Sequence, residues 1–453
     1  MIRTLIRLSR HRPIALLLLL AAATSCEEEL AIPAPGRSPP AAISDLGVIP
    51  DANIRPSGNG PAGPCGRPSF PEGTSLRRFP YLQSVTASSA RIAWTTVSGA
   101  PVRLRHFRPA DRHPIEIEAD RELFPIARTG DRIEYTAHVV TLDHLLPDTE
   151  YCYALVEGAT ILASGLVFRT AVSAAAPRRP IHILAFGDSG TGAPGQLQLR
   201  DQMLERSWDI FLHLGDIAYP WGSFDQYEQF FFNVYRDLLH AVPVYPAIGN
   251  HDILTEDGQP YRDVYYLFEN AIRPADRERY YSFDWGDIHF VSLDSNPEML
   301  WNVTDDAEDD MVDWLRADLR ASHATWKIAF FHHPAYSSGP HGSAWDVRAK
   351  ILPALEEGEV DLVLNGHDHD YERSVPIWQG MPAKPDDRRA ITYVVAGAGG
   401  GTLYGTVPDW FTVTADWMHF SYLDLSIDGC IATGKAITAD GATIDAFTLN
   451  GCD

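Results

Sequence analysis

Residues 360–373 read VDLVLNGHDHDYER, an apolar run that stops at a glycine and continues into two histidines one residue apart. The apolar part is typical of a buried strand. Gly366 then allows a sharp turn that carries His367 and His369 off the end of that strand. Two imidazoles placed in this way can face two different metal ions, although a loop with solvated histidines explains so short a motif equally well.

Four other strand-like stretches precede this run, and each is followed by a side chain that binds metal ions. The apolar stretches are residues 181–186, 210–214, 242–248 and 326–331. The side chains that follow them are, in the same order, Asp188, Asp216, Asn250 and His332. Strands that alternate with helices form a mainly parallel sheet, in which the carboxyl ends of the strands converge on one crevice. Five such stretches together therefore predict one metal centre.

The series resembles the calcineurin-like metallophosphoesterases, and Tyr219, three residues after Asp216, makes it similar to the purple acid phosphatases in particular. The resemblance implies a first ion, Fe(III), held by Asp188, Asp216, Tyr219 and His369. It implies a second ion, Fe, Zn or Mn, that is bridged by Asp216 and held by Asn250, His332 and His367. Carboxylate and phenolate oxygens suit a hard trivalent ion, and imidazole and amide ligands suit a borderline divalent ion.

The resemblance also implies an activity, the hydrolysis of phosphate monoesters by attack of a metal-bound hydroxide, as in an acid phosphatase. In that reaction His251 would stabilise charge on the phosphoryl oxygens or help the leaving group. His341, nine residues after His332, would help to protonate the leaving group, with an ordinary surface-loop histidine as the alternative. His333 is expected in the second layer around the site or in the core.

Two other functions stay open at this point. One is hydrolysis of phosphodiesters or nucleotides at the same site. The other is a non-catalytic cell-surface binding protein on a decayed enzyme scaffold. Competent side chains occupy all seven expected ligand positions, which disfavours decay.

The start of the chain predicts export. Residues 1–25 carry four arginines ahead of an apolar run that is too short to span a bilayer, as in a signal peptide. Cys26 resembles the lipidated cysteine of a bacterial lipoprotein, and simple cleavage is the alternative, so we expect a secreted or envelope-anchored protein. Residues 26–73, rich in Pro, Gly, Ala and Ser, are expected to be a linker or an extended wrap.

The charge of the chain argues against polyanionic partners. The formal net charge is -23, and removal of the four arginines of residues 1–25 would make it more negative still. Such a charge repels nucleic acid and anionic lipid. The expected partner is a small phosphate ester, which only the metal ions would attract.

Besides Cys26, the chain has four cysteines, an even number that suggests two disulfides with three possible pairings in an exported protein. We favour Cys430 with Cys452, because the two flank an expected terminal hairpin within residues 431–453. Cys65 would then pair with Cys152. Four unpaired thiols are the alternative.

Residues 76–172 predict a separate all-β domain, because short alternating runs are divided by turn residues and no amphipathic helix is apparent. The segment LLPDTEYCY, residues 145–153, resembles the tyrosine corner of a fibronectin type III sandwich. Alternation then places Tyr151 and Tyr153 inward and Cys152 outward, where the preceding wrap could reach it.

Residues 180–430 are expected to form the catalytic domain. By the same resemblance its fold is α/β (α+β), a two-sheet β-sandwich flanked by helices. Helices are expected at residues 195–206, 223–240, 307–322 and 346–356. The glycine-rich run at residues 397–402 lacks a third glycine at the required spacing and a Walker lysine, so we interpret it as a loop at the rim of the site.

Overall fold

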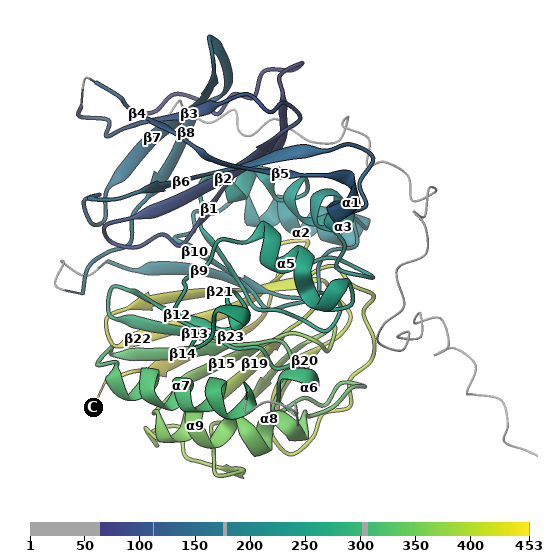
Figure 1. Cartoon of the computed structure of the whole chain (residues 1–453). Coiled ribbons are helices and arrows are strands. Elements are labelled where there is room, and N and C mark those ends of the chain that lie inside the picture. Colours follow the sequence, from purple (N-terminus) through teal and green to yellow (C-terminus); the bar gives the residue numbers. More distant parts are fainter. Residues whose placement is uncertain (1–63, 112, 175–178, 301–306, 453) are drawn as a thin grey trace, which may run out of the picture. The chain divides into compact units, whose positions relative to one another are not determined.

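The structure is a computed structural model that describes residues 64–111, 113–174, 179–300 and 307–452 (Figure 1). The predicted signal peptide, Cys26 and most of the predicted linker lie outside the described residues. All described residues belong to one unit of the chain, residues 39–453. Among them, no helix is both long enough and apolar enough to cross a membrane.

Two four-stranded antiparallel sheets form the N-terminal part of the described chain. Their strand orders are β1-β2-β6-β5 and β4-β3-β7-β8. The strands are β1 Leu76–Gln83, β2 Ala90–Thr96, β3 Val102–Phe107, β4 Ile115–Glu118, β5 Asp120–Phe124, β6 Tyr135–Leu142, β7 Glu150–Glu157 and β8 Thr160–Arg169. A helix that the sequence did not indicate, α1 Ile126–Thr129, follows β5. With four residues it is too short to show an apolar period.

The side chains around the expected tyrosine corner lie largely as predicted. Tyr151 and Tyr153 are buried, and the hydroxyl of Tyr151 accepts a hydrogen bond of 2.9 Å from the backbone N–H of Leu146. Cys152 is not exposed, however, since only 2% of it reaches solvent. The disulfide to Cys65 covers it, which confirms that pairing.

The second predicted disulfide is also present, between Cys430 and Cys452. Cys430 directly precedes the first strand of the terminal hairpin and Cys452 follows its second strand, so the disulfide joins the outer ends of the hairpin. Both predicted pairings are therefore confirmed.

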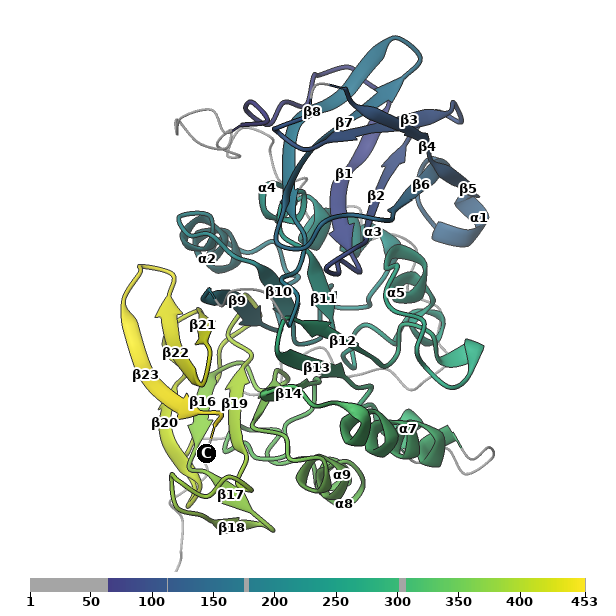
Figure 2. The ribbon, with the colours of Figure 1, turned by 90° about the vertical axis from the view of Figure 1, so that its left-hand side faces the viewer.

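Two larger sheets form the rest of the chain (Figures 1 and 2). The six-stranded sheet has the order β11-β10-β9-β21-β22-β23 and the seven-stranded sheet the order β12-β13-β14-β15-β19-β16-β20. Strands of the first are β9 Ile181–Phe186, β10 Ile210–His213, β11 Val244–Pro246, β21 Ser421–Asp428, β22 Ile431–Thr438 and β23 Thr443–Asn450. Strands of the second are β12 Tyr281–Trp285, β13 Ile288–Ser292, β14 Trp326–Phe330, β15 Leu362–Asn365, β16 Tyr371–Ser374, β19 Thr392–Ala396 and β20 Thr412–Asp416. Strands β17 Ile377–Trp378 and β18 Met381–Pro382 form a separate pair.

The predicted two-sheet fold is thus confirmed, and its strands pack through alternate side chains. In β14, Ile328 and Phe330 join a core shared with the six-stranded sheet. Ala329 between them joins a second core, which includes the helices α7 Ala307–Ala321, α8 Trp345–Lys350 and α9 Leu352–Glu357. These helices cover one face of the seven-stranded sheet (Figure 2). Successive side chains of a strand point to opposite faces of the sheet, so a strand buried on both faces contributes alternately to two cores.

The helices of this part are short, with one exception, α7. They are α2 Pro194–Met203, α3 Phe224–Gln226, α4 Arg236–Leu239, α5 Gln259–Val264, α6 Pro297–Leu300, α7 Ala307–Ala321, α8 Trp345–Lys350 and α9 Leu352–Glu357. Helices α2 and α7 match the predicted helices at residues 195–206 and 307–322 closely. The other two predicted helices are interrupted.

The helix predicted at residues 223–240 is divided into α3, a π-helical segment Tyr227–Phe232 and α4. Its consecutive aromatic side chains, Phe230, Phe231 and Phe232, are all buried, so no single apolar stripe of a regular α-helix could accommodate them. The helix predicted at residues 346–356 is divided between α8 and α9. Pro353 lies in the first turn of α9, where its missing N–H is tolerated, and would have broken a continuous helix.

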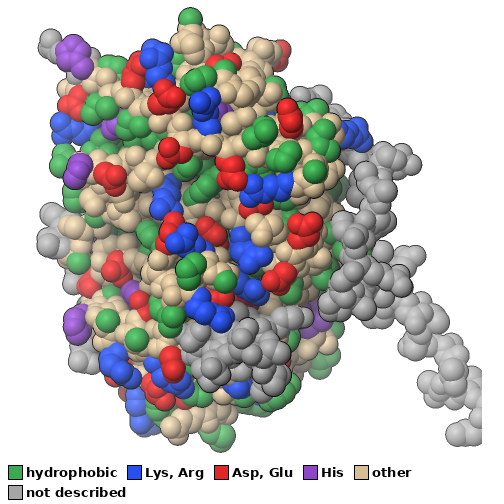
Figure 3. All heavy atoms as spheres, viewed as in Figure 1, with side chains coloured by type: hydrophobic (Ala, Val, Ile, Leu, Met, Phe, Trp, Pro, Cys, Tyr) green, Lys and Arg blue, Asp and Glu red, His purple; other side chains and the backbone are tan. Residues whose placement is uncertain are grey.

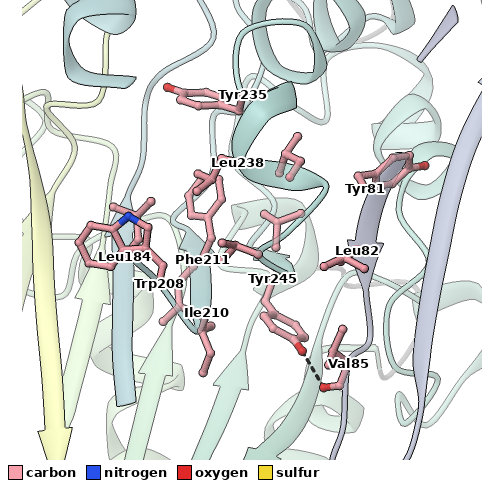
Figure 4. Close-up of a cluster of buried hydrophobic side chains, with 14 of the residues drawn as sticks. Tyr81, Leu82, Val85, Leu184, Trp208, Ile210, Phe211, Tyr235, Leu238 and Tyr245 are labelled. Carbon is pink, nitrogen blue, oxygen red and sulfur yellow. Dashed lines mark hydrogen bonds between the residues drawn. The ribbon is translucent and has the colours of Figure 1, made fainter. Parts of the chain in front are cut away.

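The N-terminal sheets and the six-stranded sheet share one hydrophobic core. Figure 4 shows part of it, where Tyr245 of β11 donates a hydrogen bond of 2.8 Å to the carbonyl of Val85. A buried ion pair adds to this contact, since Arg78 Nε lies 2.9 Å from Glu228 Oε2 in the π-helical segment. The all-β part is therefore packed directly against the larger sheets.

One buried histidine makes the stability of this fold depend on pH. His289 lies between two carboxylates, with Nδ1 2.7 Å from Asp284 and Nε2 2.9 Å from Asp318. Burial alone would lower its pKa, but the two carboxylates overcome this effect and raise the pKa from 6.5 to about 9. The stabilisation by the charged ring is therefore complete below pH 6.5 and is lost as the pH rises through about 9.

We expect His289→Gln to lower the free energy of unfolding at pH 6, because it removes the charged ring between the two carboxylates. The expected loss is about 1–3 kcal/mol, since Asp284 is largely exposed and solvent screens its contribution. At pH 10 wild type and variant should differ much less. Urea unfolding across this pH range measures the difference, with His182→Gln, at an exposed histidine, as the control. A difference that did not change with pH would contradict the ion-pair explanation.

Candidate metal centre

The predicted ligands follow five strands that end on the same side of the two sheets. Strands β9, β10 and β11 are parallel neighbours in the six-stranded sheet, and β14 and β15 are parallel neighbours in the seven-stranded sheet. Because parallel strands end at a common edge, the loops after them meet there. Those loops carry Asp188, Asp216, Asn250, His332 and His367.

Three side chains meet around the hydroxyl of Tyr219. Its oxygen lies 3.0 Å from Asp188 Oδ1, 3.0 Å from Asp216 Oδ2 and 3.0 Å from His369 Nε2. Asp188 and Asp216 are 0% and 2% exposed. Two buried carboxylates, a phenol and an imidazole are thus arranged so that one cation could contact all of them.

A second group surrounds the side-chain oxygen of Asn250. This oxygen lies 2.9 Å from His332 Nε2 and 3.1 Å from His367 Nδ1. Asp216 connects the two groups, because its Oδ2 also lies 3.4 Å from His332 Nε2. The structure therefore brings all seven predicted ligands together in two adjoining groups that share Asp216.

Backbone carbonyls orient two of the imidazoles. His332 Nδ1 donates to the carbonyl of Leu214 at 2.9 Å, and His369 Nδ1 donates to the carbonyl of Thr402 at 2.7 Å. Each ring therefore presents the lone pair of Nε2 to the site when it is neutral. His367 faces Asn250 with the opposite nitrogen, Nδ1.

The charges of the site favour a bound cation. Burial raises the pKa of Tyr219 well above its usual value, and the carboxylates of Asp188 and Asp216 raise it further. Burial would also raise the pKa of Asp216, but His332 and His251 hold it well below its usual value. Burial would lower the pKa of His332, yet Asp216 and Asp188 raise it to about 10. Buried carboxylates thus need positive charge here, which metal ions supply.

The backbone of the site is strained in a way that the sequence motifs reflect. Asp188, Asp216 and His367 adopt φ values of 58°, 52° and 75°, in the left-handed region that few residues other than glycine occupy. A Cβ on Gly249 would lie 2.2 Å from Asp216 Oδ1, and one on Gly366 would lie 2.4 Å from Asp188 Oδ2. Glycines at these positions are therefore needed for the carboxylates to approach the backbone.

His251 lies at the edge of the two ligand groups. Its backbone N–H donates to Asp216 Oδ1 at 2.8 Å, and its Nδ1 donates to the carbonyl of Pro220 at 2.8 Å. Its Nε2 lies 4.0 Å from Asp216 Oδ2. His251 is therefore held beside the predicted bridging carboxylate with Nε2 toward it.

His341 and His333 both lie beside His367. The ring centroids are 4.4 Å apart for His341 and 4.5 Å apart for His333. His333 is buried and its Nδ1 lies 2.9 Å from Ser295 Oγ, which agrees with its predicted place in the second layer. Its ring nitrogens also lie close enough to His332 and His367 to form a possible metal-binding group with them.

The sequence reasoning missed two side chains at the site. Asp368, between two predicted ligands in the sequence, is fully buried and lies 3.0 Å from His341 Nδ1. Tyr404 contacts His341 as well, and its ring stacks on that of His369 at 4.6 Å. Asp368 was visible in the motif, but no signal assigned it a partner. Tyr404 follows the glycine-rich run that was predicted to line the rim, where Gly401 N–H donates to the carbonyl of Asp188 at 2.7 Å.

Comparison with protein families identifies a Calcineurin-like phosphoesterase domain at residues 181–371. Purple acid phosphatase 21 of Arabidopsis thaliana is 28% identical over 279 residues, which cover 58% of this chain and 58% of that protein. An uncharacterized protein of Mycobacterium tuberculosis is 29% identical over 307 residues, 57% of each chain. A nucleotide pyrophosphatase/phosphodiesterase of Hordeum vulgare is 25% identical over 313 residues, 59% of this chain and 82% of that protein. The chain thus spans less than two thirds of the length of the first two relatives.

A solved structure shows the same fold. The purple acid phosphatase PPD1 from seeds of yellow lupin (Lupinus luteus) superposes with a TM-score of 0.70 at 22% identity, over 82% of this chain and 74% of that chain. The superposition covers much more of the chain than the family match does, so the β-rich N-terminal part is included. Residues 181–371 therefore form a calcineurin-like phosphoesterase domain, and the chain is a homologue of the purple acid phosphatases.

Proposed function

We propose that this protein is a metal-dependent phosphatase that hydrolyses phosphate monoesters at a dinuclear centre. The observation that carries the proposal is the meeting of seven ligand-type side chains in two groups joined by Asp216. The phosphoesterase domain and the similarity to a purple acid phosphatase support this chemistry.

The donor atoms suit two different ions. Asp188, Asp216, Tyr219 and His369 would hold Fe(III), which prefers hard anionic oxygens, and Asn250, His332 and His367 would hold divalent Fe, Zn or Mn, with Asp216 as the bridge. When bound, such ions act as Lewis acids that activate a water nucleophile and neutralise the charge of the phosphate.

The protein's own side chains would complete the reaction. His251 has Nδ1 committed to a backbone carbonyl, so its Nε2 is the nitrogen that can donate a hydrogen bond to a phosphoryl oxygen. His341, beside His367, would protonate the leaving oxygen. A net charge of -23 does not attract phosphate esters, and acidic and basic side chains are interspersed on the face that Figure 3 shows. The attraction for substrate would therefore be local to the site.

A second candidate function is hydrolysis of phosphodiesters or nucleotides at the same site. The similarity to the barley nucleotide pyrophosphatase/phosphodiesterase favours it. We further propose that the protein acts after export, because disulfides form and persist mainly in oxidising compartments.

Substrate comparison tests the proposal directly. Purified protein reconstituted with iron and zinc should release p-nitrophenol from p-nitrophenyl phosphate with a higher kcat/KM than from bis(p-nitrophenyl) phosphate. Nucleotides and phytate complete the panel. A preference for the diester or for nucleotides would establish the second function, and a metal-loaded protein without any hydrolysis would leave only a binding role.

Asp216→Ala should lose both ions and nearly all hydrolysis, because Asp216 is the side chain that contacts both ligand groups. Elemental analysis of the purified variant measures the metal content. The control is Asp252→Asn, at a buried carboxylate that accepts hydrogen bonds from the backbone of Ile217 and Gly249 but belongs to neither group. It should keep both ions. Full metal content in Asp216→Ala would refute the bridging role.

The colour of the iron-loaded protein tests Tyr219 separately. A phenolate bound to Fe(III) transfers charge to the metal, so the protein should be pink to purple. Tyr219→Phe keeps the ring but removes the oxygen, and the visible band should disappear while some hydrolysis remains. Tyr404→Phe, which removes a nearby hydroxyl outside the predicted ligand set, should keep the band. A coloured Tyr219→Phe variant would show that the phenol is not a ligand.

A further inference from the structure

We infer that Asp368 and Tyr404 position His341, so that its Nε2 is the nitrogen that gives a proton to the leaving group. The inference rests on the proposed function, because it assigns roles within the same site. Both would be positioning residues, since they act through His341 and not on the substrate.

Asp368 holds His341 through two hydrogen bonds. Its Oδ1 lies 3.0 Å from the ring Nδ1 and accepts the backbone N–H of the same histidine at 3.1 Å. Its other oxygen accepts a hydrogen bond from Ser337 Oγ. The carboxylate is fully buried, whereas the side chain of His341 is 35% exposed. A buried anion therefore orients a ring that is partly exposed to solvent.

Tyr404 presents a second acceptor to Nδ1 of His341. Its hydroxyl lies 2.9 Å from the carbonyl of His367, to which it must donate, and 3.1 Å from His341 Nδ1. Because its hydrogen is used at the carbonyl, its oxygen can only accept from Nδ1. Two acceptors, the Tyr404 oxygen and the Asp368 carboxylate, thus face Nδ1. Nδ1 is therefore the nitrogen that donates to these acceptors, and the ring presents Nε2 on its other side.

The loop that carries His341 is built closely around this carboxylate. A Cβ on Gly339 would lie 2.4 Å from Asp368 Cγ, so the loop can pass this close only with glycine there. The neighbouring buried acid of the same motif, Asp370, bonds to Thr406 instead. Of the two acids, it is Asp368 that contacts His341.

The proton transfer needs no reactant other than the water that hydrolysis consumes. As an oxygen from water bonds to phosphorus and the bond to the leaving oxygen breaks, the proton on His341 Nε2 moves to the leaving oxygen and an alcohol leaves. The ring becomes neutral and keeps its hydrogen on Nδ1, between Asp368 and Tyr404. Water then returns a proton to Nε2. The transfer matters most when the leaving alcohol is a poor one, because such an alkoxide needs protonation most.

A series of aryl and alkyl phosphates with leaving alcohols of graded acidity tests the inference. Asp368→Ala should lower kcat by about 10- to 100-fold for the poorest leaving group and by less than about threefold for the best, with KM nearly unchanged. His341→Ala should show the same trend. The variant that combines Asp368→Ala with His341→Ala should be no slower than His341→Ala alone, because the effects of residues that act as a unit are not additive. Tyr404→Phe should show the trend more weakly, since Asp368 still holds Nδ1.

Metal analysis and a matched control variant distinguish a loss of positioning from a loss of metal ions. Asp370→Asn, which alters the neighbouring acid, should keep the wild-type dependence on the leaving group. If Asp368→Ala loses metal, Asp368→Asn, which retains an acceptor oxygen, should be metal-loaded and lie between wild type and His341→Ala in its dependence. Two results would overturn this inference but not the proposed function. One is an equal loss of kcat for all leaving groups in a metal-loaded Asp368 variant. The other is a loss in the Asp368→Ala and His341→Ala double variant that equals the product of the two single losses. A wild-type protein that hydrolyses none of the esters would overturn the proposed function as well.

Discussion

Two buried carboxylates, Asp188 and Asp216, set the constraint on which the rest of the site depends. Their oxygens lie 3.0 Å from the same phenol oxygen, in a place almost without solvent. Negative charge in such a place is stable only beside cations or hydrogen-bond donors. The surrounding imidazoles, the two backbone N–H groups of His251 and His367, and the predicted metal ions all answer this requirement.

The sheets make this concentration of charge possible by holding the loops rigidly. Each carboxylate follows a strand whose side chains, apart from the exposed His182, are buried, so the strand ends cannot move apart without opening the core. The strain of left-handed residues at Asp188 and Asp216 is carried by the same packing. Contacts with the N-terminal sheets, such as that of Tyr245 with Val85, add to the core behind the six-stranded sheet.

Around the ligands lies a second layer that directs the imidazoles. Carbonyls of Leu214 and Thr402 orient His332 and His369, and Asp368 orients His341. These partners come from three separate loops. A hydrogen bond to one ring nitrogen leaves the other to face the site, which is how a scaffold selects the chemistry of histidine.

Much of this protein was readable from the chain alone. Each buried strand shows as a short apolar run, and glycines mark the turns or close approaches after four of the five strands, so one metal centre at the strand ends could be predicted. The resemblance to the calcineurin-like metallophosphoesterases implied the two-sheet fold and the seven candidate ligands. The pairing of the cysteines could be predicted from the hairpin at residues 431–453 and the wrap before β1, and the structure confirms it. These features are local, or they depend only on the order of strands.

Other features were decided by tertiary structure. The π-helical segment Tyr227–Phe232 interrupts the predicted helix because the helix is buried on more than one side. Cys152 is covered by a segment that is far away in the sequence. The contacts of Asp368 and Tyr404 with His341 join loops whose spacing along the chain carries no signal. The apolar periodicity of a sequence indicates which residues are buried, but not which other residues they contact. The partner of a hydrogen bond is set only when the two sheets close on each other and bring their loops together.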